Sequence, residues 1–126
     1  MTLMDSDVCI DILREYAPAL SWFAGLDEVP SIPGFCAVEL VVGADDRREL
    51  ETVRRFLGRF DIVWPEVVDM EHSLAVCAPL HLSHGLGALD SLIAGLAVGR
   101  SATLLTFNSR HFRAVPGITL EQPYAR

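Results

Sequence analysis

The chain has 126 residues, of which 51% are hydrophobic, so it is long enough to bury one core and is not disordered. Its net charge of −7 argues against a general nucleic-acid-binding protein, because neutralising phosphates supplies most of that affinity. No apolar run approaches the roughly 20 residues that span a bilayer, and Asp5 interrupts the N-terminus before a signal segment can form. We therefore expect one domain, residues 1–126, located in the cytoplasm and not in a membrane.

The three cysteines, Cys9, Cys36 and Cys77, lie far apart in apolar surroundings and form no CxxC pair. An odd number with this spacing fits neither a disulfide framework nor a structural zinc site. We expect them to be reduced core residues.

Short strand-like and helix-like segments alternate along the chain, separated by Pro and Gly, which is typical of α/β proteins. In the first half, Ser6 is the predicted N-cap of the first helix and Pro33 with Gly34 forms a predicted turn. The strands expected there cover residues 2–4 and 28–32, and the helices cover residues 7–15, 17–26, 35–42 and 45–60.

In the second half, Pro65 suits the first turn of a helix, and Pro116 with Gly117 forms a predicted turn. The strands expected there cover residues 61–64, 102–106 and 118–121, and the helices cover residues 65–80 and 88–98. The predicted fold class is therefore α/β, with a short, mainly parallel sheet of four to five strands flanked by helices.

Two carboxylates lie on helix faces that are otherwise apolar. Glu39 has Phe35 and Cys36 one turn before it and Val42 one turn after it. Asp90 has Leu86 four positions before it, and Ile93, Ala94 and Ala97 follow on the same side. Each helix therefore presents one acid within an apolar surface.

Asp5 is a third unusual acid, because it follows an apolar strand at the edge of a parallel sheet where ligands collect. Burying an unpaired carboxylate costs several kcal/mol, and the chain has no Lys to neutralise it. A hard divalent cation such as Mg²⁺ or Mn²⁺ resolves this cost, because it takes oxygen ligands and activates water for attack on a phosphodiester. Hydrolysis of RNA or single-stranded nucleic acid is the reaction class that follows.

Each acid also has an ordinary structural interpretation. Asp5 can be an acid at a helix start, Glu39 can pair with an Arg, and Asp90 can cap the loop before its helix. Asp7 and Asp11 are interpreted as first-turn or solvated acids. The combination of three buried acids favours the metal site over three independent structural roles.

Four segments that contain these acids resemble, in order, the motifs of the PIN-domain family, and within it the VapC-type toxins. Residues 3–8 (LMDSDV) are similar to the first motif, with Asp7 where Asn is usual. Residues 39–44 and 89–97 are similar to the second and third acidic motifs, and residues 104–112 to the last. The resemblance spans essentially the whole chain.

The resemblance implies a PIN-like fold and a Mg²⁺ or Mn²⁺ site formed by Asp5, Glu39 and Asp90. Asn108 stands at the fourth acidic position as an amide, which can coordinate or hold a water but brings no charge. That difference leaves the number of metal ions open.

Around this site, the resemblance implies that Ser6 and Thr106 hydrogen-bond to carboxylates or to metal-bound water. Arg110, close in sequence to Asn108, is a predicted RNA contact. Family members typically form homodimers and are inhibited by a VapB-type antitoxin. Their usual substrates are structured RNAs, including initiator tRNA and ribosomal RNA, so the implied function is a toxin endoribonuclease.

Two other function classes remain open from the sequence. The segment Asp5-Ser6-Asp7 resembles the DxD of haloacid-dehalogenase-type phosphatases, but those enzymes also need a Lys, which is absent. A non-catalytic PIN-like module that only binds a partner is compatible with the missing fourth acid, whereas the three intact acids argue against it.

Overall fold

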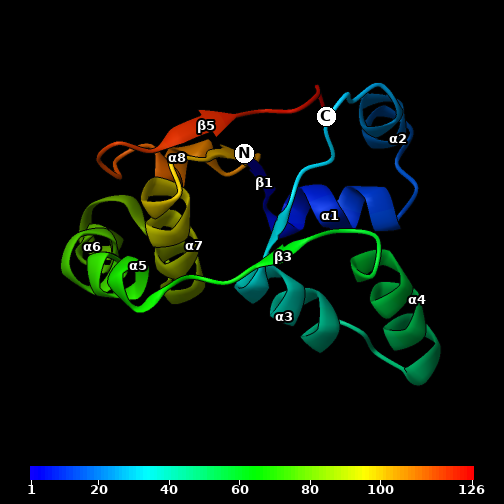
Figure 1. The fold of residues 1–126 in the computed structure, drawn as a ribbon, viewed down its shortest axis with the longest axis horizontal. Coiled ribbons are helices and arrows are strands. Elements are labelled where there is room, and N and C mark those ends of the chain that lie inside the picture. The colour runs from blue at the N-terminus through cyan, green and yellow to red at the C-terminus, as the bar shows by residue number, and fades with distance from the viewer.

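Strand β1 (Thr2–Met4) lies in the middle of the sheet in the computed structural model, which describes all of residues 1–126 (Figure 1). It pairs in parallel with β4 (Thr103–Leu105), which pairs in parallel with β5 (Thr119–Glu121). On the other side, a parallel bridge from Leu3 to Ser31 leads to β2 (Ile32–Pro33), which pairs with β3 (Ile62–Val63). The spatial order is β3-β2-β1-β4-β5, and the predicted parallel sheet is confirmed.

The strand order reverses between β1 and β4. From β1 the chain continues to β2 on one side of the sheet, and it returns later to build β4 and β5 on the other. Helices leaving neighbouring strands in opposite directions open a crevice at the carboxyl ends, where ligands bind in parallel α/β sheets. Asp5 and Thr106 follow the last residues of these two strands, so both stand at this crevice.

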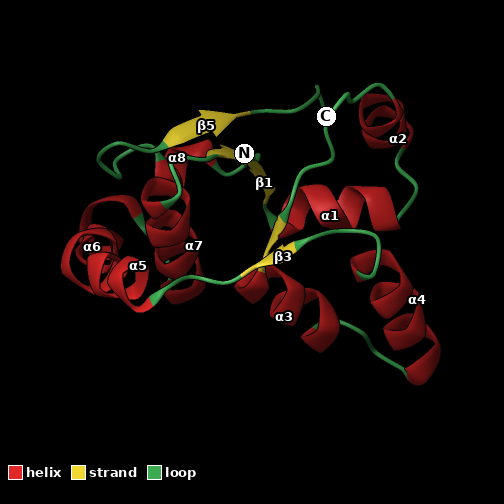
Figure 2. Ribbon diagram, in the orientation of Figure 1, coloured by secondary structure: helices red, strands yellow, loops and turns green.

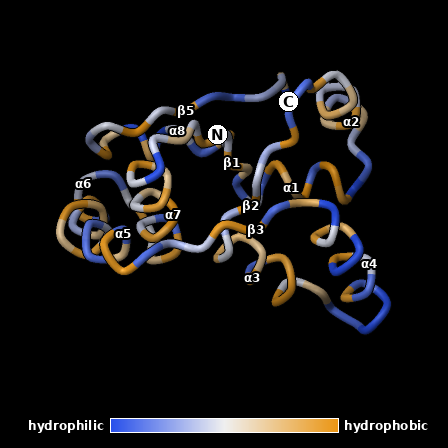
Figure 3. The backbone as a smooth tube through the Cα atoms, in the orientation of Figure 1, coloured by the Kyte–Doolittle hydropathy of each residue, from blue (hydrophilic) through white to orange (hydrophobic).

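Four helices from the first half of the chain gather on one side of Figure 1. They are α1 (Ser6–Leu13), α2 (Ala17–Ala24), α3 (Gly34–Val42) and α4 (Arg47–Leu57). Helix α3 packs between α1 and α4, and α4 is amphipathic, burying Val53 and Phe56 while its arginines face solvent. Figure 3 shows the result as a largely hydrophilic α4 beside a largely hydrophobic α3.

The helices of the second half lie on the other side of the molecule (Figure 2). They are α5 (Val67–His72), a π-helical turn (Ser73–Cys77), a 3₁₀ turn (Ala78–Leu80), α6 (His81–His84), α7 (Ala88–Gly99) and α8 (Ser109–Phe112). The single helix predicted over residues 65–80 is wrong in this respect. Pro79 has no N–H to continue the ladder, and Gly95 of α7 approaches Ser73 so closely that a Cβ would overlap its hydroxyl.

Three other local predictions are corrected. Asp5, not Ser6, is the N-cap of α1, because its Oδ1 accepts a 2.8 Å hydrogen bond from the Ser6 backbone N–H. The strand expected over residues 28–32 is shifted to Ile32–Pro33, and Gly34 begins α3 instead of forming a turn. Gly34 is required by packing, because a Cβ there would overlap the Trp64 ring.

The core contains 24 buried hydrophobic residues contributed by the sheet and both groups of helices. All three cysteines lie in it as free thiols, as predicted. None of the helices is both long enough and apolar enough to cross a bilayer.

Candidate active site

Asp5 and Thr106 form the floor of the crevice between β1 and β4. Asp5 is only 5% exposed, and its Oδ2 accepts a 2.8 Å hydrogen bond from the hydroxyl of Thr106, which is 1% exposed. The other oxygen, Oδ1, accepts from the Ser6 N–H and lies 3.6 Å from the Cys36 thiol. Adjacent strands and a helix start therefore hold this carboxylate in one orientation.

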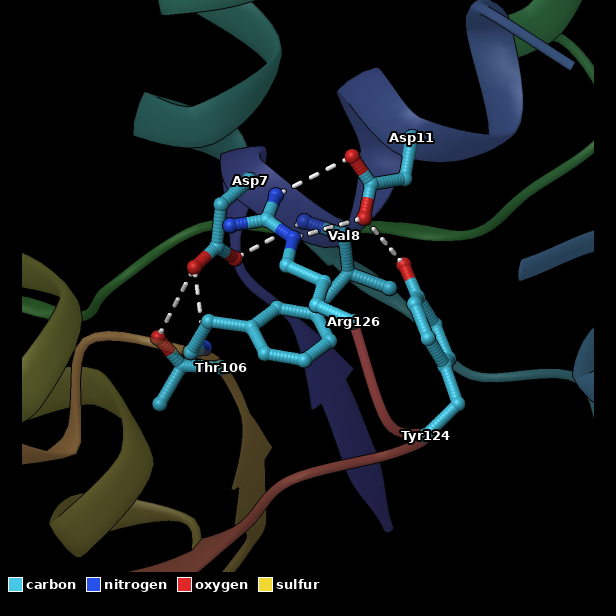
Figure 4. A network of polar contacts seen from close by, with 7 residues as sticks. Asp7, Val8, Asp11, Thr106, Tyr124 and Arg126 are labelled. Atoms are coloured by element: carbon cyan, nitrogen blue, oxygen red, sulfur yellow. Dashed lines mark hydrogen bonds and ion pairs between the residues drawn. The ribbon is translucent and has the colours of Figure 1, made fainter. Parts of the chain in front are cut away.

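Asp7, in the first turn of α1, ties that helix to the loop after β4. Its Oδ2 accepts a 2.9 Å hydrogen bond from the Phe107 N–H and lies 3.4 Å from the Thr106 hydroxyl, as Figure 4 shows. Its Oδ1 accepts from the Val8 N–H at 2.8 Å. Burial and the charge of Asp5 raise the pKa of Asp7 to about 6.

Glu39 and Asp90 approach the same crevice from α3 and from the first turn of α7. Burial raises the pKa of Glu39, with further contributions from the charges of Asp5, Asp90 and Asp7. Burial also raises the pKa of Asp90, with a further contribution from the charge of Asp7, although the neighbouring His111 opposes this. Burial raises the pKa of Asp5 as well, against its hydrogen bonds. Four acids thus share one region in which the ionised form of each is disfavoured by the charge of at least one other.

A cavity of about 300 Å³ opens above this cluster. Most of its wall is polar and acidic: Asp5, Ser6, Asp7, Asp90, Phe107, Asn108 and Arg126. Glu39 lies on the wall of a neighbouring groove, which Ser6 also lines, along α3 and α4. The arrangement places three carboxylates and one amide around a space large enough for an ion and part of a phosphodiester.

The family model of the PIN domain matches residues 2–118 of this chain. The chain belongs to the PIN-domain family. The match covers β1, the four acids and Asn108, so the family resemblance of the sequence motifs is confirmed and the phosphatase alternative is wrong.

Two curated relatives of this PIN domain are proteins named tRNA(fMet)-specific endonuclease VapC. The protein from Shigella flexneri is 25% identical over 125 residues, which cover 94% of this chain and 95% of the relative. The protein from Salmonella typhimurium is 30% identical over 95 residues, which cover 71% and 72%. Among solved structures, DNA-bound VapBC from Salmonella typhimurium is similar with a TM-score of 0.82 and 26% identity, covering 96% of this chain and 98% of that one.

The donor set of this PIN domain fits a hard divalent cation. Carboxylates and one amide supply only oxygen ligands, and burial and neighbouring carboxylates raise the pKa values of Asp5, Glu39 and Asp90, a destabilisation that a bound cation would relieve. As the side chains stand, no three Asp, Glu, His or Cys residues are close enough to share one ion. Neither Glu39 nor Asp90 belongs to an ion pair of the protein, so no basic side chain neutralises them within the chain.

The structure brings most of the predicted site residues of the PIN domain together. Asp5, Asp90, Asn108 and Ser6 line one cavity, and Thr106 makes the predicted hydrogen bond to a carboxylate beneath it. Ser6 contributes its backbone N–H to Asp5. Arg110, on α8, is exposed and does not line the cavity, so its contact with RNA stays a prediction.

Three residues near the site were missed or misread from the sequence. Asp7 is a first-turn acid, as expected, but it also lines the cavity and fixes the loop at Phe107. Asp11 is not a solvated acid, because it is paired with Arg126 and accepts a 2.7 Å hydrogen bond from Tyr124. Arg126 lines the cavity itself, and no local pattern could have linked it to a residue 115 positions away.

Proposed function

We propose that this PIN domain is a divalent-metal-dependent endoribonuclease and acts as the toxin of a toxin–antitoxin pair. The observation that carries the proposal is that Asp5 and Asp90 line one cavity and Glu39 the adjoining groove, with raised pKa values and no ion pair to any of the three. Family membership and the two endonuclease relatives support the same reaction.

Asp5, Glu39 and Asp90 would hold the ion, with Asn108 as an additional oxygen ligand or water-binding group. When bound, Mg²⁺ or Mn²⁺ would polarise the scissile phosphodiester and lower the pKa of a water. Thr106 keeps an oxygen of Asp5 oriented, and the Ser6 N–H holds the other. Asp7 fixes the loop that carries Asn108 through its hydrogen bond to Phe107.

The partners follow from the relatives. Several similar structures are VapBC complexes, so the proposed inhibitor is a VapB-type antitoxin, and the proposed state of the free toxin is a homodimer. The proposed substrate is a structured RNA, with tRNA favoured over ribosomal RNA because both curated relatives are named for tRNA(fMet). Buried free thiols fit the reducing cytoplasm, where such RNAs are found.

The test is cleavage of total cellular RNA by purified protein free of antitoxin. Discrete fragments are expected with Mg²⁺ or Mn²⁺, and none with EDTA or with the Asp90→Asn variant. In parallel, Mn²⁺ at about 100 times its dissociation constant is expected to raise the free energy of unfolding of the wild type by roughly 2.7 kcal/mol, measured by thermal unfolding. The same Mn²⁺ concentration should stabilise the Asp90→Asn variant much less.

A folded protein that binds Mn²⁺ and still cleaves no RNA would contradict the nuclease proposal and favour the partner-binding module. Cleavage that persists in EDTA and in Asp90→Asn would contradict the metal mechanism.

A further inference from the structure

Arg126 is the only cationic side chain on the wall of the acidic cavity. It is the last of ten arginines in the chain, and it reaches the site because the segment after β5 returns across the molecule towards α1 (Figure 1). Tyr124 anchors this segment by packing against Phe107, with ring centroids 4.9 Å apart, and against Trp22 at 5.7 Å. Arg126 is therefore held at the cavity by a built aromatic support.

The guanidinium of Arg126 is fixed on one edge and on one face. Its Nε and Nη2 donate two 3.0 Å hydrogen bonds to the two carboxylate oxygens of Asp11, whose side chain is only 14% exposed. Its Cζ lies 4.3 Å from the centre of the Phe107 ring. Figure 4 shows the group lying between Asp11 and Asp7. This geometry removes most of the rotamer freedom that a free arginine would lose on binding a ligand.

The remaining donors of Arg126 are not used inside the protein. A guanidinium has five N–H groups, and the pair with Asp11 uses one on Nε and one on Nη2. No ion pair joins Arg126 to Asp7, although the two charges influence each other. The free donors therefore lie beside the cavity, where they can bind an anion.

We propose that Arg126 binds a backbone phosphate of the RNA at the mouth of the cavity and so positions the strand over the acids. The inference rests on the proposed nuclease function. An acidic cavity repels a phosphodiester, so a substrate needs fixed positive charge next to the acids as well as the ion that they hold. The planar guanidinium matches phosphate oxygens in a bidentate manner, which a lysine cannot reproduce. This assigns the phosphate contact to Arg126 in addition to the predicted Arg110.

The experiment measures the affinity of a short fluorescein-labelled single-stranded RNA by anisotropy over a series of salt concentrations. Ca²⁺ replaces Mg²⁺, so that binding is followed separately from cleavage. The variants are Arg126→Ala, Arg126→Lys and Arg54→Ala. Arg54 is exposed on α4 and makes no ion pair, so its variant removes the same charge away from the cavity.

For Arg126→Ala we expect about tenfold weaker binding. The slope of log K against log salt should become shallower by about 0.7, which is one phosphate contact on a single strand. Arg126→Lys should keep the slope and recover part of the affinity, and Arg54→Ala should match the wild type. Circular dichroism and thermal melts establish that each variant is folded.

An unchanged slope for Arg126→Ala overturns the inference, even if the affinity falls, because lost packing of the tail weakens binding without changing the number of phosphate contacts. An equal effect in Arg54→Ala also overturns it. Wild-type protein that binds RNA but fails to cleave it with Mg²⁺ contradicts the nuclease proposal alone, and the slopes still decide the role of Arg126. Wild-type protein that binds no RNA overturns both.

Discussion

The hydroxyl of Thr106 donates a 2.8 Å hydrogen bond to Oδ2 of Asp5, across a sequence separation of 101 residues. The contact exists because β1 and β4 are parallel neighbours in register, with Met4 opposite Leu105, so the next residue on each strand lies at the same edge. The Thr106 oxygen also accepts a 3.0 Å hydrogen bond from the Asn108 N–H. The Thr106 hydroxyl therefore connects the carboxylate of Asp5 with the loop that carries Asn108, the residue at the fourth acidic position of the family motifs.

Replacing Thr106 by Val should preserve the packing and remove this connection. Because Asp5 loses its orienting donor, we expect RNA cleavage to fall by about 10- to 100-fold. Initial rates measured at saturating Mg²⁺ test this. Thr106→Ser, which keeps the hydroxyl, is the matched control and should retain most of the activity. Wild-type rates in Thr106→Val would show that the hydrogen bond is dispensable.

The metal-free protein should be more stable at pH 5 than at pH 7.5. The pKa values of Asp5, Asp7, Glu39 and Asp90 are raised in the folded state, that of Asp7 to about 6. The folded state therefore binds protons more tightly than the unfolded chain, and stability rises as the pH falls through these values. Urea midpoints or melting temperatures measured in EDTA should show this increase.

Asp7→Asn is the control for the pH experiment, because it removes one of the four titrating groups. It should therefore reduce the change in stability between pH 7.5 and pH 5. The pair between Asp11 and Arg126 does not interfere, since the pKa of Asp11 is lowered and this residue stays ionised over the whole interval. Stability that decreases steadily from pH 7.5 to pH 5 would show that the acids are not mutually destabilised.

Replacing Asn108 by Asp should increase the affinity for Mn²⁺. Asn108 lines the cavity with Asp5 and Asp90, so the variant adds a negative oxygen ligand where the chain has an amide. Without metal the same variant should be less stable than the wild type at pH 7.5, because a further like charge enters the cluster. Isothermal titration with Mn²⁺ and a melt in EDTA measure the two effects, which should have opposite directions. Weaker Mn²⁺ binding would place Asn108 outside the ligand set.

Gly34→Ala should destabilise the fold by about 1–3 kcal/mol, because the new methyl group overlaps the Trp64 ring and forces the chain to shift. Denaturant unfolding measures the change. Gly58→Ala is the matched control: its backbone is helical and a Cβ would lie 3.5 Å from the nearest atom, the Arg54 carbonyl oxygen. That variant should be neutral or more stable by up to about 1 kcal/mol. Equal losses in both variants would contradict the packing role of Gly34.

The sequence by itself predicted the fold class and the family, both of which are confirmed, and it singled out the candidate acids of the site. Alternating apolar segments separated by Pro and Gly indicate parallel α/β structure, and Glu39 and Asp90 are conspicuous because their own helix faces are apolar. These are local signals, since the neighbours that matter lie within four residues on one helix. Asp5, at the end of an apolar strand, is an equally local signal, whereas Thr106 was predicted from the resemblance of its segment to the last motif of the PIN-domain family.

Tertiary structure alone decided the contacts between distant segments. The α-helix predicted over residues 65–80 is interrupted where Gly95 of α7 approaches Ser73. The position of Arg126 depends on how β5 ends and on where Tyr124 packs. The contacts of Asp5 with Thr106 and of Asp11 with Arg126 join residues more than 100 positions apart. The energies of such contacts come from burial and charge pairing in the folded chain, which leave no periodicity in the sequence.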